Sequence, residues 1–260
     1  MSGFNDFIYR VKRSQNPFFR SLKRFLGYIM YPTAYRLPRW TKPPLRLVYE
    51  LHWVGVMIFR LLVGVFYSYP LFQARCATFG RNIRIDKMPY VSGGVEIHLH
   101  DNTIIGGNVS ILSGSVYEKP LLIFRERAGV GWGTTITVNR EVILEEDVIV
   151  SYDCRISDTD GHRREADLRA AGQPPSPADC RPVRIGKYAW IGNGTHIMKG
   201  VTVGEGAIIG ANSVVISDIP PYALAMGNPA EVILPNVGLP STRRKKKPPL
   251  QRPPEGEAGH

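Results

Sequence analysis

Three side chains with acid–base chemistry lie close together at Asp158, Asp160 and His162, in the stretch CRISDTDGH. A neutral imidazole has an ordinary pKa of about 6.5, so it can accept a proton from a hydroxyl group near neutral pH. A carboxylate beside it can fix the tautomer of the ring or stabilise the imidazolium, and either aspartate could do this. The same residues are also typical of a polar turn with a solvated histidine. The elements that position them must decide between these interpretations.

The other histidines do not form a pattern of metal ligands. His98 and His100 alternate with apolar residues, which predicts that both point outward from a strand, and His196 is also expected to face outward. Together with His162 they lack the spacing with which three histidines converge on zinc. We therefore predict no metal site.

Composition and length exclude several classes of protein. The chain has 260 residues, of which 43% are apolar and 21% charged, enough for one sizeable core and too apolar for a wholly disordered chain. Cys76, Cys154 and Cys180 are too few and too scattered for a disulfide framework or a thiolate metal site. A reducing compartment is therefore expected.

A six-residue period runs through residues 185–220. Each block opens with a β-branched apolar residue, and its fifth residue is mostly small. The opening residues are Ile185, Ile191, Ile197, Val203, Ile209 and Val215, and the fifth residues are Ala189, Thr195, Val201, Ala207, Ser213 and Ile219. This period is typical of a parallel β-helix, in which both positions point into the coil and stack on their equivalents above and below.

The same period recurs upstream with less regularity. Its opening positions are Leu99, Ile105, Ile111, Phe124, Val130, Ile136, Leu144, Val150 and Ile156, and the last three blocks place Val148, Cys154 and Asp160 at the inward fifth position. A polar, proline-rich excursion over 161–183 separates these blocks from Ile185. A loop of that length in a regular solenoid is usually functional.

The formal charge of +11 is concentrated at the two ends of the chain. Residues 1–75 carry twelve basic and two acidic side chains, 76–240 carry fifteen and eighteen, and 241–260 carry six and two. A near-neutral body between basic ends argues against a nucleic-acid-binding fold with a basic face. It favours ends that meet an anionic surface.

The N-terminal segment 1–75 is predicted to be a helical extension rich in basic and aromatic residues. Its apolar stretch 45–72 is interrupted by Arg46, Glu50 and Arg60, and a central arginine costs about 2.5–3.5 kcal/mol on insertion. We interpret the stretch as a helix in the membrane interface or packed on the body, rather than a spanning helix. The tail, 241–260, is predicted to be disordered, with basic residues 243–247 as a weak electrostatic anchor.

The run from Tyr188 to Ile233 resembles the hexapeptide-repeat acyltransferases, which include galactoside, maltose and exopolysaccharide O-acetyltransferases. The resemblance extends over about residues 95–234 and includes the closing GNPA at 227–230. It implies an all-β fold, a left-handed parallel β-helix over 76–240, assembled as a homotrimer. It also implies acetyl-CoA as the donor, bound between coils of different subunits, and a sugar-like acceptor with a hydroxyl or amine.

The resemblance also implies roles for individual residues. His162 stands where relatives have their catalytic base, and Asp158 or Asp160 would assist it. Acetyl-CoA contacts are implied for the positions of Trp190, Gly192, Asn193 and Ala211, although the tryptophan could instead be an external cap on the coil. Asn139 is the nearest candidate for an asparagine that assists the acceptor in relatives.

The chain departs from the family where relatives place basic residues near the CoA phosphates. Ser217, Glu231 and Leu234 stand there instead. We expect Arg243–Lys247 of the tail to supply that charge, and a donor other than CoA is the second option.

We therefore expect an O-acetyltransferase that acts on a sugar, a polysaccharide precursor or a lipid-linked acceptor. Basic ends favour a cytoplasmic protein held peripherally on the inner face of a membrane. The alternatives are a catalytically inactive β-helix scaffold at a membrane surface and, less in keeping with the charge distribution, a nucleic-acid-binding protein.

Overall fold

The computed structural model describes residues 14–30 and 38–237. They belong to two compact units, the first ending at Phe59 and the second beginning at Arg60. In the first unit, α2 covers Pro17–Met30, and the short 3₁₀ helix η2 (Arg39–Thr41) leads into α3 (Lys42–Val63), which continues into the second unit. The predicted disordered tail 241–260 lies outside the described residues.

Helical structure continues from Arg39 to Arg75, because α3 is followed by the π-helical turn η3 (Gly64–Ser68) and by α4 (Tyr69–Arg75). This confirms the helix predicted over 45–72. The segment has a mean hydropathy of 1.7 in its most apolar window, and by length and composition it could cross a membrane. Its apolar side chains are exposed on all sides of α3.

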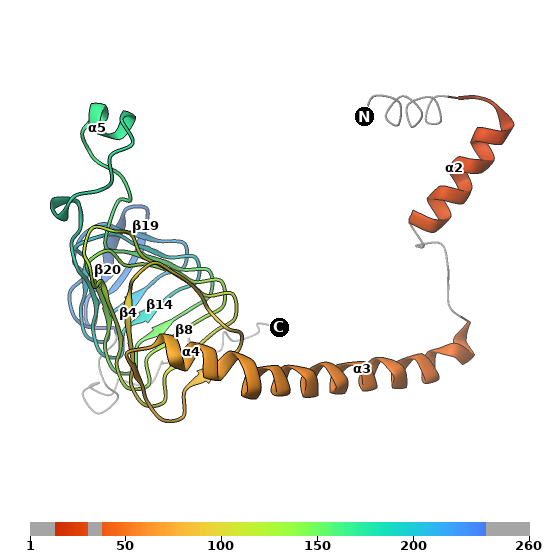
Figure 1. Ribbon diagram of the computed structural model, residues 1–260, viewed down its shortest axis with the longest axis horizontal. Helices are drawn as coiled ribbons and strands as arrows, with labels where there is room; N and C mark the ends of the chain where they lie inside the picture. The colour runs from red at the N-terminus through yellow and green to blue at the C-terminus, as the bar shows by residue number, and fades with distance from the viewer. Residues whose placement is uncertain (1–13, 31–37, 238–260) are drawn as a thin grey trace, which may run out of the picture. The chain divides into compact units, whose positions relative to one another are not determined.

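The second unit contains a parallel β-helix whose coils each contribute one strand to each of three sheets (Figure 1). Sheet A consists of β1 (Thr78–Phe79), β4 (Glu96–Leu99), β7 (Leu121–Phe124), β10 (Glu141–Leu144), β13 (Val183–Ile185) and β16 (Thr202–Val203). Sheet B consists of β2 (Arg84–Ile85), β5 (Ile104–Ile105), β8 (Gly129–Val130), β11 (Ile149–Val150), β14 (Trp190–Ile191), β17 (Ile208–Ile209), β19 (Leu224–Gly227) and β20 (Ala230–Leu234). Sheet C consists of β3 (Tyr90–Ser92), β6 (Ser110–Leu112), β9 (Thr135–Thr137), β12 (Arg155–Ser157), β15 (His196–Ile197) and β18 (Val214–Val215).

Three corners join the sheets, and each is named for the two sheets it connects. The AB corner is formed by 80–83, 100–103, 125–128, 145–148, 186–189 and 204–207. The BC corner is formed by 86–89, 106–109, 131–134, 151–154, 192–195 and 210–213. The CA corner is formed by 93–95, 113–120, 138–140, 158–182, 198–201 and 216–219. Its long turn 158–182 is the excursion, which contains α5 (Ala166–Ala170) and η4 (Pro177–Asp179).

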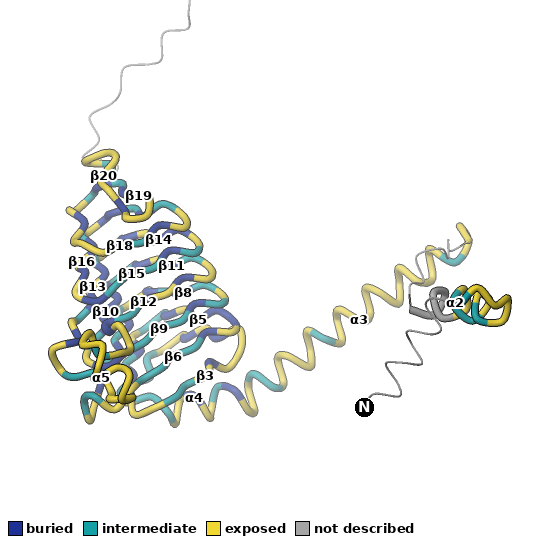
Figure 2. Tube along the Cα trace, turned by 90° about the horizontal axis from the view of Figure 1, so that it is seen from above, coloured by how far each residue is buried: buried dark blue, intermediate teal, exposed yellow. Residues whose placement is uncertain are grey.

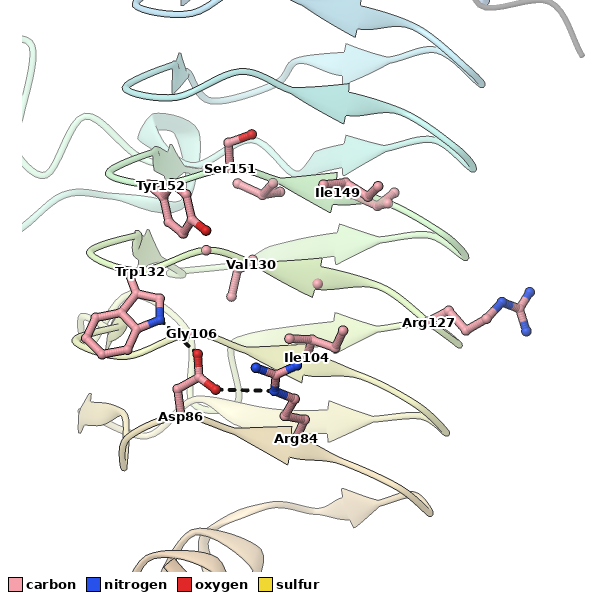
Figure 3. Close-up of a pocket in the computed structure, with 14 residues that line it drawn as sticks. Arg84, Asp86, Ile104, Gly106, Arg127, Val130, Trp132, Ile149, Ser151 and Tyr152 are labelled. Carbon is pink, nitrogen blue, oxygen red and sulfur yellow. Dashed lines mark hydrogen bonds and ion pairs between the residues drawn. The ribbon is translucent and has the colours of Figure 1, made fainter. Parts of the chain in front are cut away.

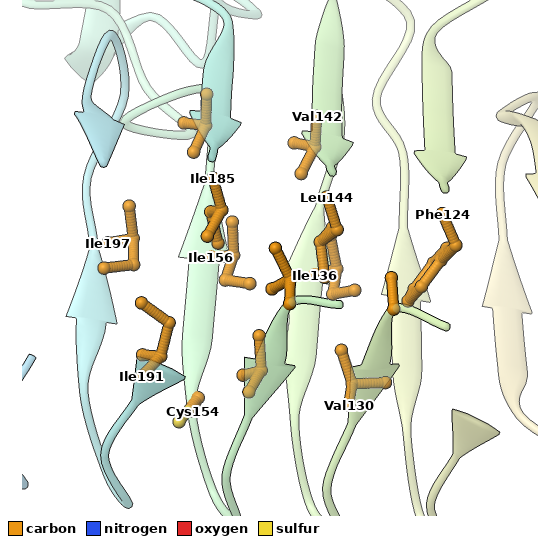
Figure 4. Packing of buried hydrophobic residues seen from close by; sticks show 14 of the residues in the cluster. Phe124, Val130, Ile136, Val142, Leu144, Cys154, Ile156, Ile185, Ile191 and Ile197 are labelled. Carbon is orange, nitrogen blue, oxygen red and sulfur yellow. The ribbon is translucent and has the colours of Figure 1, made fainter. Parts of the chain in front are cut away.

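The core is a continuous column of apolar side chains inside the coils (Figure 4), and Figure 2 shows buried residues along the stacked coils. All the opening positions predicted from the six-residue period are buried, as are the fifth positions from Ala189 to Ile219. The small side chains Ala189, Ala207 and Ser213 fill corners, where the backbone turns sharply and leaves little room. The strand pairs Ile156↔Ile197 and Leu144↔Ile185 show that the coil resumes in register across the excursion.

The fifth-position prediction is wrong for Asp160, whose side chain is 35% exposed. The chain leaves the coil at Asp158, two residues before the period would turn inward, so Asp160 already belongs to the excursion. Asp158, at the point where the chain leaves the coil, is buried.

Both ends of the coil are covered. At the N-terminal end, Phe72 of α4 enters the core, the Tyr69 hydroxyl accepts a hydrogen bond from Ile85 N (3.1 Å), and Arg75 donates to Val95 O (3.0 Å). At the C-terminal end, β20 folds back antiparallel on β19 after the turn at Asn228–Pro229.

Candidate active site

The CA corner positions the acid–base residues that the sequence singled out. Asp158 is fully buried, and its carboxylate accepts hydrogen bonds from the backbone N–H groups of Asn139 (2.8 Å), Arg140 (2.6 Å) and Glu141 (2.8 Å). Burial raises the pKa of the Asp158 carboxyl, although the three amide donors oppose the rise. Through these hydrogen bonds the Asp158 carboxylate connects one coil to the next.

Asp160 is also engaged, but by side chains. Its Oδ2 lies 2.6 Å from Nζ of Lys199 and 3.6 Å from Nε of Arg164. Among the described residues, neither Asp158 nor Asp160 is bonded to His162. A direct role for either carboxylate in orienting the imidazole therefore stays a prediction.

His162 lies at the mouth of the excursion, after Gly161, whose φ of +76° is the left-handed turn that redirects the chain. The histidine is exposed, and no described residue is hydrogen bonded to its ring. An exposed imidazole whose ring makes no hydrogen bond to a described residue is accessible to a substrate hydroxyl and can accept its proton.

The predicted acetyl-CoA contacts gather at sheet B and the BC corner. Trp190 is 51% exposed, with its Nε1 3.2 Å from the Ser151 hydroxyl. Asn193 is exposed at the BC corner that follows in the same coil. At Gly192, a Cβ would lie only 2.7 Å from the backbone N of Ala211 in the next coil. Glycine is required there because the coils stack too closely for a side chain.

A groove of about 400 Å³ runs along the outer face of sheet B, directly below Trp190 in the coil stack (Figure 3). It is hollow because Gly129 stands between Ile104 and Ile149 in the outward row of strand residues. Trp132 and Tyr152 line its BC side.

Polar groups line the lower end of this groove. Nε1 of Trp132 donates to Oδ2 of Asp86 (2.8 Å), and Nε of Arg84 lies 3.3 Å from the other carboxylate oxygen. Aromatic faces beside a fixed carboxylate and a guanidinium can stack on and hydrogen bond to a polyhydroxylated ligand.

The two groups of predicted site residues do not meet within one chain. His162 follows sheet C at the CA corner, whereas Trp190 lies in sheet B, which is the face opposite that corner in a coil of three sheets. Asn139, by contrast, does lie at the CA corner beside Asp158.

Three features of the site were not predicted from the sequence. Lys199, Asp179 and Trp132 carried no signal in the six-residue period, because each stands at a corner or in the excursion. A lysine at an otherwise small or apolar corner was the available clue for Lys199. Ser217 and Glu231 are exposed where relatives carry basic residues, and the tail that was expected to replace them lies outside the described residues.

Comparison with known proteins agrees with this fold. Residues 182–217 match the family model of the bacterial transferase hexapeptide (six repeats). Galactoside O-acetyltransferase from Escherichia coli (strain K12) is 30% identical over 163 residues, which are 63% of this chain and 66% of the relative. The chain thus spans just under two thirds of that relative's length.

Two solved structures are also similar. A galactoside acetyltransferase in complex with coenzyme A has 26% sequence identity and a TM-score of 0.41, covering 65% of this chain and 69% of that one. A maltose O-acetyltransferase from Clostridium difficile 630 has 26% identity and a TM-score of 0.39, covering 68% of this chain and 80% of that one.

Proposed function

We propose that the chain is a member of the hexapeptide-repeat family and an O-acetyltransferase that moves an acetyl group from acetyl-CoA to a hydroxyl of a sugar-like acceptor. The observation that carries the proposal is the placement of His162, an exposed imidazole at the mouth of the excursion that leads to the matched repeats. The name of the Escherichia coli relative supports the reaction class.

In the proposed reaction, His162 is the general base. It takes the proton from the acceptor hydroxyl while that oxygen attacks the thioester carbonyl carbon of acetyl-CoA. A carbon–oxygen bond forms, the carbon–sulfur bond breaks, and the imidazolium returns the proton to the departing CoA thiolate. The products are the O-acetylated acceptor and CoA.

A complete site requires a second copy of the chain. Because His162 and Trp190 occupy opposite sides of one coil, a cleft holding both must be formed by His162 of one subunit and Trp190 of its neighbour. We propose a homotrimer of left-handed β-helices with three such clefts, since closed cyclic symmetry makes all three equivalent.

Mixing two inactive variants tests this arrangement. His162→Ala and Trp190→Ala should each abolish most CoA release from acetyl-CoA, measured with a thiol-reactive dye. Trimers assembled from equal amounts of both should regain about a quarter of the wild-type activity, because one cleft in four combines both intact residues. No recovery in verified mixed trimers would contradict the shared cleft, and full activity of His162→Ala would favour the scaffold alternative.

The groove on sheet B supports a sugar-like acceptor. Gly129→Val would fill its floor, and a Cβ at Gly129 would lie 3.4 Å from Ile104 Cβ, in ordinary contact. We expect this variant to raise the acceptor KM while leaving acetyl-CoA binding by calorimetry unchanged. Unchanged acceptor KM would place the acceptor elsewhere.

The basic tail supports a further part of the proposal, the binding of the CoA phosphates by Arg243–Lys247. Calorimetry should show acetyl-CoA binding weakened in a chain truncated after Pro240 relative to the intact chain. Equal binding by both would make the tail dispensable for the donor.

We also propose that the protein is held peripherally on the inner face of a membrane through its N-terminal unit. The exposed apolar side chains of α3 and its flanking basic residues support this. Deletion of residues 1–59 should reduce sedimentation with anionic vesicles. Deletion to Arg75 is a poorer test, because it would remove Phe72 from the β-helix core.

A further inference from the structure

Lys199 is a buried lysine with no part in the six-residue period. It stands at the CA corner after β15, and its side chain is only 4% exposed. An ammonium group taken out of water costs several kcal/mol unless charged or polar partners surround it, so its contacts must be specific.

The Nζ of Lys199 joins the two arms of the excursion. It lies 2.6 Å from Oδ2 of Asp160 on the outgoing arm, and it donates to the backbone O of Asp179 (2.7 Å) on the returning arm. Beneath it, Thr159 and Cys180 form an antiparallel bridge, so the arms are already adjacent at this level. The lysine therefore fastens the point at which the excursion leaves the coil.

Asp179 extends this connection into the returning arm. Its carboxylate accepts hydrogen bonds from Ser176 N and Oγ, both at 2.8 Å, and lies 3.5 Å from Nη1 of Arg163. The backbone hydrogen bond from Ser176, more than the charges nearby, holds the pKa of the Asp179 carboxyl below its ordinary value. Because Arg163 adjoins His162 in the chain, the network holds residues on both sides of His162, Asp160 before it and Arg163 after it.

Gly161 is the only residue between Asp160 and His162. Its left-handed backbone has open space around the Cβ position, so nothing packs against this link. The location of the imidazole must then be set by the anchors on either side, Asp160 and Arg163.

We propose that Lys199 is a positioning residue, which holds the base of the excursion closed so that His162 projects into the cleft in its reactive place. This inference rests on the proposed function. It concerns the residue that presents the base, and it does not make Lys199 a group that touches substrate.

The variants Lys199→Met and Lys199→Arg test the proposal, with Lys187→Met as the matched control. Lys187 also pairs with a carboxylate, that of Glu146 at 3.2 Å, but at the AB corner. In Lys199→Met, kcat should fall about 10- to 100-fold, because small displacements of a reacting group have effects of this size. The KM for acetyl-CoA should stay unchanged, Lys199→Arg should retain most of the activity, and Lys187→Met should match the wild type.

The pH profile separates positioning from loss of stability. The charged groups that pair with one another at the base of the excursion, next to His162 in the chain, are Asp160, Arg163, Arg164 and Glu165, with Asp179 on the returning arm and Lys199 from the coil. Removing the Lys199 cation leaves the Asp160 carboxylate less neutralised, which favours the imidazolium. The acidic limb of kcat/KM should therefore move to higher pH in Lys199→Met and stay in place in Lys187→Met.

Hydrogen–deuterium exchange supplies a readout that needs no activity. Amides of residues 158–182 should exchange faster in Lys199→Met, while those of the coils stay protected. Faster exchange in Lys199→Met, together with a wild-type protein that shows no acetyl transfer, would leave the fastening role of Lys199 intact and overturn the proposed function alone. Unchanged exchange, or an unchanged kcat and pH profile in Lys199→Met, would overturn the positioning role.

Discussion

The AB and CA corners both carry acidic and basic side chains, but in opposite surroundings. At the AB corner, pairs such as Arg127 with Asp147 and Lys187 with Glu146 stack up the outside of the coil, with both basic side chains about half exposed. At the CA corner, Asp158 and Lys199 are buried and bonded to backbone atoms. The exposed pairs lie on the surface of a coil that would form without them. The buried side chains of Asp158 and Lys199 instead hold the excursion where it leaves the coil.

The largest expected difference between the two corners is in how far turnover falls when their histidines are replaced. His162→Ala should lower kcat about 10²- to 10⁴-fold, the range for loss of a general base. His100→Ala, at the AB corner beside Arg125, should leave turnover within a factor of two, because no proton transfer passes through it. Steady-state CoA release measures both. Equal losses in the two variants would remove the functional distinction between the corners.

The carboxylates should differ in their effect on stability. Asp158→Ala leaves the three amide donors that meet this buried carboxylate without their acceptor, so we expect the free energy of unfolding to fall by about 3 kcal/mol. Asp147→Ala removes an exposed ion pair and should cost less than about 1 kcal/mol. Urea denaturation of both variants gives the comparison, and similar losses would show that burial does not set the difference.

The smallest expected effect is the pH and salt response of the AB corner. The hydrogen bond from Arg127 holds the pKa of Asp147 below its ordinary value. A lowered folded-state pKa stabilises the protein above the ordinary aspartate pKa, about 3.9, and this stabilisation is lost as pH falls through the folded value. Asp147→Asn should therefore flatten the acid limb of the stability curve slightly, and high salt should shrink the difference at neutral pH. A steeper acid limb of the stability curve in Asp147→Asn would contradict this prediction.

The sequence predicted the coil well because its constraint repeats. Each turn must place an apolar residue inside and a small one at the corner, so positions such as Ile185 and Ala189 could be identified without a structure. The site was less predictable, because it occurs where the repeat stops. Asp160 fits the inward period but lies outside the coil, and Lys199 stands at an outward position of the period yet is buried.

The boundary between the N-terminal extension and the β-helix was also only partly predictable from the sequence. Composition alone separates residues 1–75 from the rest, since the basic and aromatic character ends there. Phe72, however, belongs to the core of the β-helix, because an open end of stacked coils needs an apolar cover. Long-range packing of this kind leaves no periodic trace in the sequence.

The covered ends of the coil also bear on aggregation. A stack of parallel strands presents unpaired backbone N–H and C=O groups at its first and last coils, which can template the addition of further chains into a filament. Here α4 lies across the first coil. At the other end, β20 pairs with β19 in the antiparallel sense, which does not match the parallel pairing that a further coil would need. These covers oppose the addition of further chains to the coil ends. The β-helix therefore ends after its own coils, although the six-residue repeat itself sets no length.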